Sequence, residues 1–220
     1  MTTPARTRTP RWPGILLGAS LGILLAGGAF LLFRPKAPPP LPAYGELPPF
    51  QLTDQDGRPF GRADLRGQVW VGSFIFTRCE TICPVIVSKV KGVKEKTADL
   101  GPALRLVSFS VDPKYDRPAV LQAYAKQRGA DDPRWVFLTG DYQVMRETVV
   151  DGLKMVMEQG AEGDPDAIFH GSHLVLVDGT GRIRGYYDTS APDVIERVAR
   201  DGRALVESGA GMSDAAIARR

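Results

Sequence analysis

Two cysteines, Cys79 and Cys83, are the residues of this sequence best suited to chemistry. They lie four positions apart in the stretch FTRCETICP, between an apolar run of strand length and a segment with helical periodicity. The unpaired N–H groups and the dipole of a helix N-terminus stabilise a thiolate, which lowers the pKa of a cysteine and raises its reactivity. If the loop is wound as helix, this spacing also brings both sulfur atoms onto one face, within reach of each other or of one ion.

The only two histidines, His170 and His173, lie far downstream, just ahead of the apolar segment LVLVD. Two thiolates alone under-coordinate a soft ion such as Cu(I), so metal binding needs a third donor, and imidazole is a suitable one. Folding commonly brings such distant loops together. From spacing alone, three interpretations stay open: a metal site, a redox-active dithiol, or an inert disulfide with the histidines on a polar loop.

The segments around the cysteines alternate between strand and helix patterns. Continuous apolar runs predict strands buried on both faces, at 68–76, 104–111 and 135–140. Helical patterns are found at 85–100, 117–128, 142–152 and 192–200. Turn residues at Asp56-Gly57 and at 179–181 predict one hairpin at the start of the domain and another near its end. The order βαβ followed by ββα is that of an α/β, thioredoxin-like fold, with helices flanking a mixed central sheet.

The net charge of +3 belongs to the N-terminal segment. Residues 1–45 contain five basic side chains and no acidic one, so the other 23 basic and 25 acidic residues leave a formal charge of −2. No cluster of Lys or Arg with interleaved aromatic residues follows, which argues against nucleic-acid binding. Two cysteines are also too few for a four-cysteine zinc or iron–sulfur site, or for a disulfide-dense scaffold.

Residues 14–33 form an uncharged apolar run, GILLGASLGILLAGGAFLLF. As a helix, about 20 such residues span a hydrocarbon core about 30 Å thick. A cleaved signal peptide is the rival interpretation, but its apolar region is usually only about 7–15 residues long. Arginines in residues 1–13 place that end in the cytoplasm by the positive-inside rule. The sequence thus predicts a single-pass anchor in the inner (cytoplasmic) membrane, with the following domain in the periplasm or an equivalent intermembrane space.

A proline-rich segment, residues 34–46, follows the predicted anchor. Its prolines favour an extended polyproline spacer that holds the next domain away from the membrane. The folded domain, which contains both cysteines and both histidines, is predicted at 47–206. The small and polar residues of 207–220 predict a flexible, frayed tail.

Three stretches of the predicted domain carry a family resemblance. The first is F-T-x-C-x-x-x-C-P at 76–84, and the second is V-D-P at 111–113, followed by D-R-P at 116–118. The third is a histidine ahead of a V-L-V-D-G-x-G-R-I hairpin. Together they resemble the SCO/SenC family of membrane-anchored copper chaperones, which have a thioredoxin-like fold and assist cytochrome c oxidase assembly. Many members have Pro and Asp after the first cysteine, where this chain has Glu80 and Thr81.

In that family the two motif cysteines and one histidine bind copper, which implies Cys79 and Cys83 as ligands here. Family members place the histidine ligand eight positions before the residue matched by Asp178, and eleven before the glycine matched by Gly181. Both counts give His170. The resemblance therefore implies a three-ligand Cys₂His site for Cu(I), which could also hold Cu(II).

The resemblance further implies a metallochaperone, rather than an enzyme, that delivers copper by ligand exchange to the binuclear centre of cytochrome c oxidase subunit II. Other copper chaperones and thioredoxin-like reductants are further expected partners, and the N-terminal helix contacts the membrane. The alternative is a thiol–disulfide oxidoreductase that reduces the acceptor's cysteines before metallation. Redox members of this fold usually have C-x-x-C, so the wider spacing counts against it. A single-cysteine peroxidase is a third interpretation, and neither enzyme has a task for His170.

Other side chains near these motifs are secondary candidates. Asp112, at a strand end and before a proline, is predicted either to shape the surface that faces the acceptor or simply to begin a turn. Met155 and Met157, in a region expected to be a polar loop, are candidate soft donors, although methionine usually just fills gaps in a core. His173 is expected either to be exposed to solvent or to lie next to the ligands without binding the ion itself.

Overall fold

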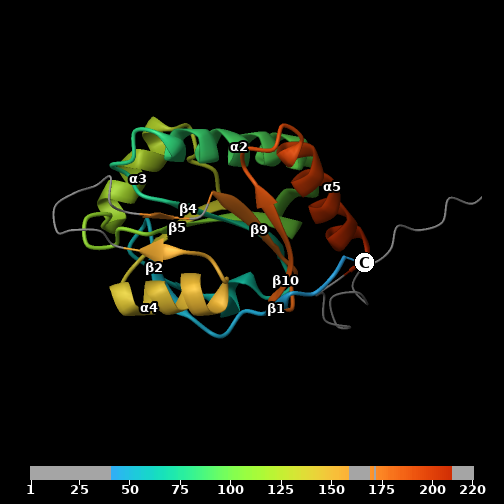
Figure 1. Ribbon diagram of the computed structural model, residues 1–220, viewed down its shortest axis with the longest axis horizontal. Helices are drawn as coiled ribbons and strands as arrows, with labels where there is room; N and C mark the ends of the chain where they lie inside the picture. The colour runs from blue at the N-terminus through green and yellow to red at the C-terminus, as the bar shows by residue number, and fades with distance from the viewer. Residues whose placement is uncertain (1–40, 159–168, 171, 210–220) are drawn as a thin grey trace, which may run out of the picture. The chain divides into compact units, whose positions relative to one another are not determined.

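The computed structural model of the protein describes residues 41–158, 169–170 and 172–209 (Figure 1). The strands are β1 (Gly45–Glu46), β2 (Gln51–Asp54), β3 (Pro59–Gly61), β4 (Val69–Ile75), β5 (Leu104–Ser110), β6 (Trp135–Thr139), β7 (Met157–Glu158), β8 (Phe169–His170), β9 (His173–Val177) and β10 (Arg182–Asp188). The α-helices are α2 (Ile82–Lys96), α3 (Pro118–Gln127), α4 (Tyr142–Arg146) and α5 (Val194–Glu207). Short 3₁₀ segments, η1 (Arg62–Leu65) and η2 (Ala98–Ala103), and a π-helix, η3 (Glu147–Gly152), complete the set.

Eight strands form one mixed sheet in the order β1-β10-β9-β4-β5-β6-β2-β3. The three central strands, β4, β5 and β6, run parallel to one another, and the strands on either side of them run antiparallel. Strands β7 and β8 pair in a separate two-stranded sheet. The parallel centre with antiparallel edges confirms the predicted mixed α/β sheet.

Helices cover the sheet on both faces (Figure 1): α2, α3 and α5 lie on one face and α4 on the other. Helix α5 buries one stripe, which includes Val194, Val198 and Leu205, as expected of an amphipathic helix. Helices α2 and α5 pack closely where α2 has Gly92, because a Cβ at that position would come within 2.6 Å of Cδ1 of Ile195. This packing fixes α2, and with it the cysteine motif, on the sheet.

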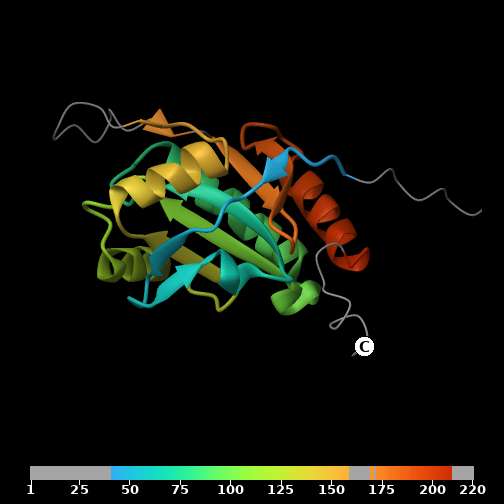
Figure 2. The same cartoon turned by 90° about the horizontal axis from the view of Figure 1, so that it is seen from below.

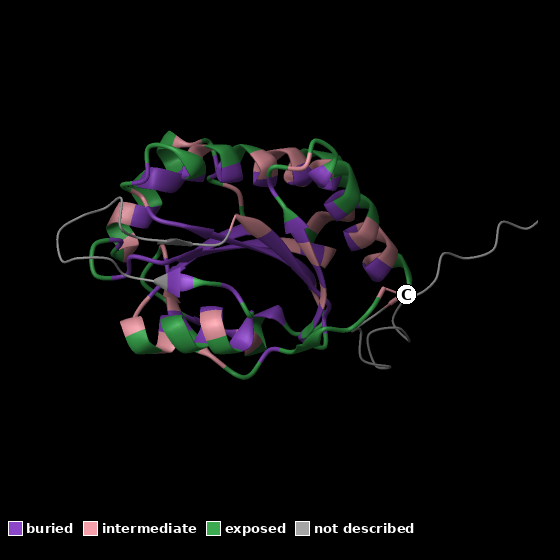
Figure 3. Ribbon diagram, in the orientation of Figure 1, coloured by how far each residue is buried: buried purple, intermediate pink, exposed green. Residues whose placement is uncertain are grey.

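Strands β4 and β6 are buried along their whole length and β5 at every residue but Arg105 (Figure 3), which is why their sequences are largely apolar runs. Every residue of β4 is buried. Some polar groups in this layer bond to one another: the hydroxyls of Ser73 and Ser108 are 2.8 Å apart, and Nε1 of Trp135 donates to Oγ of Ser108 at 2.9 Å. The buried hydroxyl of Thr139, at the end of β6, has no hydrogen-bond partner among the described residues. The scaffold beneath the site is a packed apolar core with a few internal polar contacts.

Both predicted hairpins are confirmed. The turn between β2 and β3 is closed by the Asp54 carboxylate, whose Oδ1 accepts from the backbone N–H groups of Asp56 and Arg58 at 2.9 and 2.8 Å. Gly57 in this turn has φ of +79°, in the left-handed region that glycine adopts most easily. Gly181, in the turn between β9 and β10, also lies in the left-handed region, with φ of +88°.

The helix predicted over 142–152 is confirmed in its bounds: α4 and the π-helix η3 together span it. One sequence expectation in the region that follows was wrong. Met155 and Met157 are not in a polar loop: they are 7% and 4% exposed and belong to the core. The chain leaves η3 toward the core, and the two flexible thioether side chains fill the space there.

The start of the described domain is held to the sheet. Strand β1, within the segment predicted as a linker, pairs with β10 at the sheet edge (Figure 2). The Arg184 guanidinium donates to the carbonyl oxygens of Leu41 and Pro42. The predicted anchor, residues 14–33, lies outside the described residues. Of the helices that the structure does describe, none is both long enough and apolar enough to cross a bilayer.

Candidate metal centre

The cysteine motif lies where the central strand β4 ends and α2 begins. Cys79 is in the connecting turn, in which its N–H donates to the carbonyl oxygen of Phe76 at 3.2 Å. Cys83 is in the first turn of α2. In open α/β sheets this edge, at the carboxyl ends of parallel strands, is where ligands bind. The position of the motif therefore agrees with a functional site.

The two cysteines contact each other and are both thiols. The N–H of Cys83 donates to Sγ of Cys79 at 3.3 Å, and Oγ1 of Thr81 lies 3.7 Å from the same sulfur. Cys79 is 6% exposed and Cys83 is fully buried. Two sulfur donors thus lie together at a helix N-terminus, an arrangement that fits a soft ion such as Cu(I).

The environment separates the acidities of the two thiols. Burial opposes ionisation of Cys79, but hydrogen bonds from Cys83 and Thr81 outweigh it and hold the pKa of Cys79 below its ordinary value. Burial raises the pKa of Cys83 strongly, and the charges of Cys79 and Asp116 raise it further, against a backbone hydrogen bond with Phe76. Cys79 is therefore the more readily ionised thiol, and a bound ion must displace the proton of Cys83.

The predicted histidine ligand comes from the segment before β9. Strand β9 pairs antiparallel with β4, Gly72 opposite Val175, so the start of β9 lies at the same sheet edge as the end of β4. His170 itself is in β8, where its backbone pairs with Met157. Its side chain is outside the described part of the structure, so its role as a ligand stays a prediction.

His173, the other histidine, begins β9 and lies opposite Asp188 of β10. Hydrogen bonds from Ser190 lower the pKa of Asp188, and the proximity of His173 lowers it slightly more. Among the side chains that the structure describes, no three or more His, Cys, Asp and Glu form a group able to hold a metal ion. The described part of the site is thus the cysteine pair.

A buried carboxylate lies beneath the cysteine loop. Asp116, between β5 and α3, is fully buried and accepts hydrogen bonds from N–H and Oγ1 of Thr77 and, at 2.7 Å, from Oγ of Ser110. Burial raises the pKa of Asp116, although the bonds from Thr77 and Ser110 oppose this. In the sequence, Asp116 is part of the D-R-P stretch at 116–118 that carries the family resemblance, but nothing in that pattern assigns it a role.

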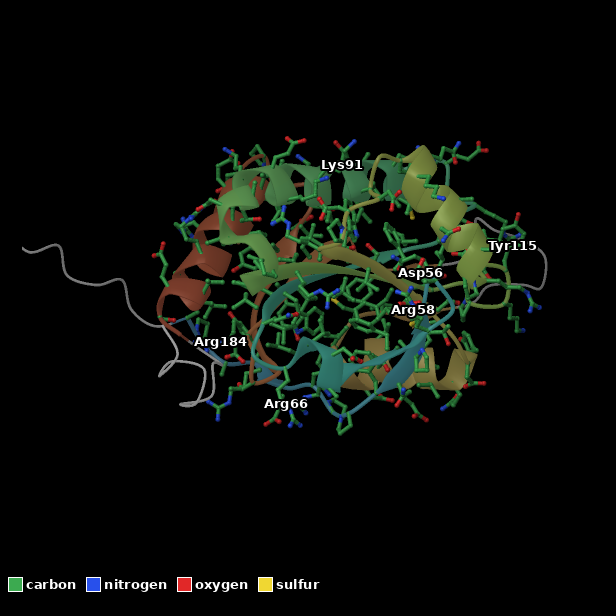
Figure 4. The ribbon with its side chains drawn as sticks, turned by 180° about the vertical axis from the view of Figure 1, so that it is seen from behind. Asp56, Arg58, Arg66, Lys91, Tyr115 and Arg184 are labelled. Atoms are coloured by element: carbon green, nitrogen blue, oxygen red, sulfur yellow. The ribbon has the colours of Figure 1, made fainter. Side chains whose placement is uncertain are left out.

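Asp112 both begins a turn and holds the surface beside the cysteines. Its carbonyl oxygen accepts from the N–H groups of Tyr115 and Asp116 at 3.1 and 2.9 Å. Its carboxylate binds Arg78 at 2.6 Å, and the Arg78 guanidinium stacks 4.4 Å from the ring centre of Tyr115. Tyr115 projects outward at this end of the molecule (Figure 4). Both sequence interpretations of Asp112 are compatible with these contacts.

The surface around the motif is open to a partner. Ile82 and Val85, on the first turns of α2, are 37% and 45% exposed. A hollow of about 420 Å³ adjoins the start of the cysteine loop, lined by Thr77, Arg78, Tyr115 and residues of α3. Apolar side chains are therefore accessible next to the cysteine pair.

Comparison with known proteins identifies the relatives of the chain. The family model described as SCO1/SenC matches residues 41–207. The chain belongs to the SCO1/SenC family. A relative, the SCO1 protein homolog of Bacillus subtilis, is 34% identical over 158 residues, which cover 70% of this chain and 81% of the relative. The resemblance inferred from the motifs is thereby confirmed.

Solved SCO1/SenC structures share the fold. A family lipoprotein from Bacillus anthracis is 30% identical, with a TM-score of 0.67 over 78% of this chain and 99% of its own. BsSco, described as a cytochrome c oxidase assembly protein with a disulfide switch, is 28% identical, with a TM-score of 0.65 over 78% of this chain and 96% of its own. Three further structures, at 24%, 20% and 22% identity, contain copper and show the shared fold.

Proposed function

We propose that the chain is a copper chaperone that delivers copper to the binuclear centre of cytochrome c oxidase subunit II. The observation that carries this proposal is the cysteine pair, joined by a 3.3 Å N–H···S contact at the carboxyl edge of the central strands. Family membership supports copper as the cargo, and relatives with copper bound or described in oxidase assembly support the pathway. Copper transfer then proceeds by ligand exchange between thiolates and imidazoles of donor and acceptor.

In this proposal Cys79, Cys83 and His170 bind the copper ion. Two thiolates and one imidazole form a three-coordinate set for Cu(I), and Cu(II) can occupy the same donors. Binding requires the dithiol, so oxidation of the pair to a disulfide blocks loading. A set of only three ligands leaves a position at which an acceptor's ligand can attack.

The proposed setting is the outer face of the inner membrane. Residues 14–33 serve as the anchor, 1–13 lie in the cytoplasm, 34–46 act as the linker, 47–206 form the copper-binding domain and 207–220 are a tail. A relative described as a lipoprotein agrees with attachment to a membrane. Protease protection of the full chain in sealed spheroplasts tests this topology: the domain should be cleaved from outside, while an N-terminal tag should be protected.

A copper titration tests the ligand set. The reduced full chain, in detergent and without oxygen, should bind one Cu(I) in competition with a chromogenic chelator. Cys79→Ala and Cys83→Ala should abolish binding in that competition, and His170→Ala should weaken it by about tenfold or more. His173→Ala is the matched control and should bind as the wild type does. Absence of Cu(I) binding by the wild type, or equal binding by His170→Ala, contradicts the proposed site.

The alternative function is a thiol–disulfide oxidoreductase acting on the acceptor, and the separation of the two thiol acidities favours it. The Cys79 thiolate would attack a disulfide sulfur of the acceptor and form a mixed disulfide. Cys83 would then attack Sγ of Cys79, which releases the reduced acceptor and leaves a Cys79–Cys83 disulfide, so that two electrons pass to the acceptor. If the chain is an oxidoreductase, Cys83→Ala should trap the mixed disulfide between Cys79 and an oxidised acceptor domain. If no mixed disulfide forms and the wild type transfers copper to a reduced acceptor, the chaperone function is favoured.

A further inference from the structure

Asp116 is a buried negative group next to the proposed copper site. It is fully buried, and its three hydrogen-bond donors, the N–H and hydroxyl of Thr77 and the hydroxyl of Ser110, are all uncharged. Among the described residues, no Lys, Arg or His forms an ion pair with its carboxylate. A carboxylate that accepts three hydrogen bonds without a cation retains its charge but has little of it neutralised.

The basic residue directly before Cys79 is committed elsewhere. Arg78 binds the Asp112 carboxylate at 2.6 Å and stacks on the Tyr115 ring, and its side chain is 36% exposed. The charge of Asp116 is felt at Arg78, but it is also felt at the sulfur of Cys83. Thr77, which Asp116 holds through two hydrogen bonds, is only two residues before Cys79. The carboxylate therefore both positions the cysteine loop and acts on it electrostatically.

We propose that Asp116 is a positioning residue whose buried charge sets the oxidation-state preference of the copper site, favouring Cu(II) over Cu(I). This inference rests on the proposed Cys79, Cys83 and His170 ligand set. With two thiolates and a neutral imidazole, bound Cu(II) gives a net charge of zero, and addition of one electron gives Cu(I) and a net charge of −1. A fixed negative charge nearby in a medium of low dielectric opposes that added charge.

The consequence for the chaperone is a weaker hold on Cu(I) than the same ligands would give without Asp116. Interactions between buried charges are screened much less than those at the surface, so the effect persists at physiological salt. A site that must release its ion benefits from this, because a thiolate pair alone binds Cu(I) strongly. The carboxylate thus limits the affinity without replacing a ligand.

The experiment measures the midpoint potential of bound copper in the full chain, with redox mediators supplying or accepting one electron per copper. Asp116→Asn keeps the shape of the side chain and removes its charge. It should raise the Cu(I)-to-Cu(II) affinity ratio by about tenfold, which is a rise in potential of about 59 mV. Competition titrations of Cu(I) and Cu(II) give the same ratio independently.

Two further variants separate charge from structure. Ser110→Ala removes one donor to the same carboxylate but keeps its charge, so the potential should stay at the wild-type value or fall. Arg78→Gln removes the nearby cation and should lower the potential. If Asp116→Asn leaves the midpoint potential unchanged or lowers it, the inference is wrong. If Asp116→Asn does not fold, Arg78→Gln decides. A midpoint potential of Arg78→Gln at or above that of the wild type then overturns the inference.

Failure of the inference and failure of the proposed function are distinguishable. If the wild type binds no copper, the function fails and the inference falls with it. If the wild type binds copper through the three proposed ligands but the charge variants share its potential, only the inference fails. Circular dichroism of each variant in the reduced, metal-free form shows whether a change in potential accompanies a change in fold.

Discussion

Asp178 and Asp116 are both buried carboxylates, 3% and 0% exposed, but they lie at opposite ends of the central strands. Asp178 follows β9 and so lies at the amino end of β4, on the side where Arg184 is seen in Figure 4. Asp116 bonds to Ser110 at the carboxyl end of β5, on the side where Tyr115 is seen. Each accepts a backbone N–H and a threonine hydroxyl.

Among the described residues, Asp178 forms an ion pair with an arginine and Asp116 forms none. Arg184 binds Asp178 at 2.8 Å and also holds the carbonyl oxygens of Leu41 and Pro42. Burial of Asp178 is outweighed by bonds from Thr180 and Arg184, so its pKa is lowered, whereas burial dominates at Asp116 and raises the pKa there. Asp178 is thus neutralised by an arginine, whereas no cation among the described residues pairs with Asp116 beside the cysteines.

The largest expected effect is on the paired carboxylate. Asp178→Asn should lower the free energy of unfolding by about 3 kcal/mol, because it leaves the Arg184 guanidinium, which is only 14% exposed, without its anion. Urea unfolding of the reduced, metal-free chain at neutral pH measures this. Asp193→Asn is the matched control, since its ion pair with Arg197 is exposed and long, at 4.0 Å, and should change stability by less than about 0.5 kcal/mol. Equal losses of unfolding free energy in Asp178→Asn and Asp193→Asn would contradict a stabilising role of the Asp178–Arg184 ion pair.

The sequence predicted the local elements of this comparison well. The apolar runs at 68–76 and 104–111 correspond closely to β4 (Val69–Ile75) and β5 (Leu104–Ser110), because strands buried on both faces need continuous apolar sequence. The position of the cysteine motif between β4 and α2 was predicted for the same reason. These features depend on residues that are neighbours in the chain.

What the sequence could not predict depends on contacts between distant residues. Asp116 is separated from Thr77 by 39 positions, and only the parallel pairing of β4 with β5 brings them together. The same holds for the burial of Met155 and Met157, since a local polar pattern does not reveal what packs over it. The choice of His170 over His173 rested on family spacing and stays a prediction.

A smaller effect on the free energy of unfolding is expected at Asp116. Asp116→Asn should change the free energy of unfolding by less than about 2 kcal/mol, because loss of charge-assisted bonds to Thr77 and Ser110 is offset by removal of a buried charge. The same urea titration measures it, beside Asp178→Asn. Should Asp116→Asn cost as much as Asp178→Asn, the two ends of the sheet would not differ in the way that their partners indicate.

The smallest effect is the pH dependence of stability, and its sign is opposite for the two carboxylates. The folded pKa of Asp178 lies below the ordinary value of 3.8, so its contribution is present above that pH and is lost as the pH falls through the folded pKa. The folded pKa of Asp116 lies above 3.8, so the folded state binds the extra proton, and stability is lost as the pH rises from 3.8 through the folded pKa.

Urea unfolding between about pH 3 and pH 7 tests these signs. On acidification, the stability difference between wild type and Asp178→Asn should shrink by on the order of 1 kcal/mol. Over the same range, wild type should gain on Asp116→Asn by a similar or smaller amount as the pH falls, because only the wild type takes up the proton. If the unfolding free energies of the two variants depend on pH in the same way, the prediction is contradicted. The ion pair of Asp178 with Arg184 would then not distinguish its pKa from that of Asp116.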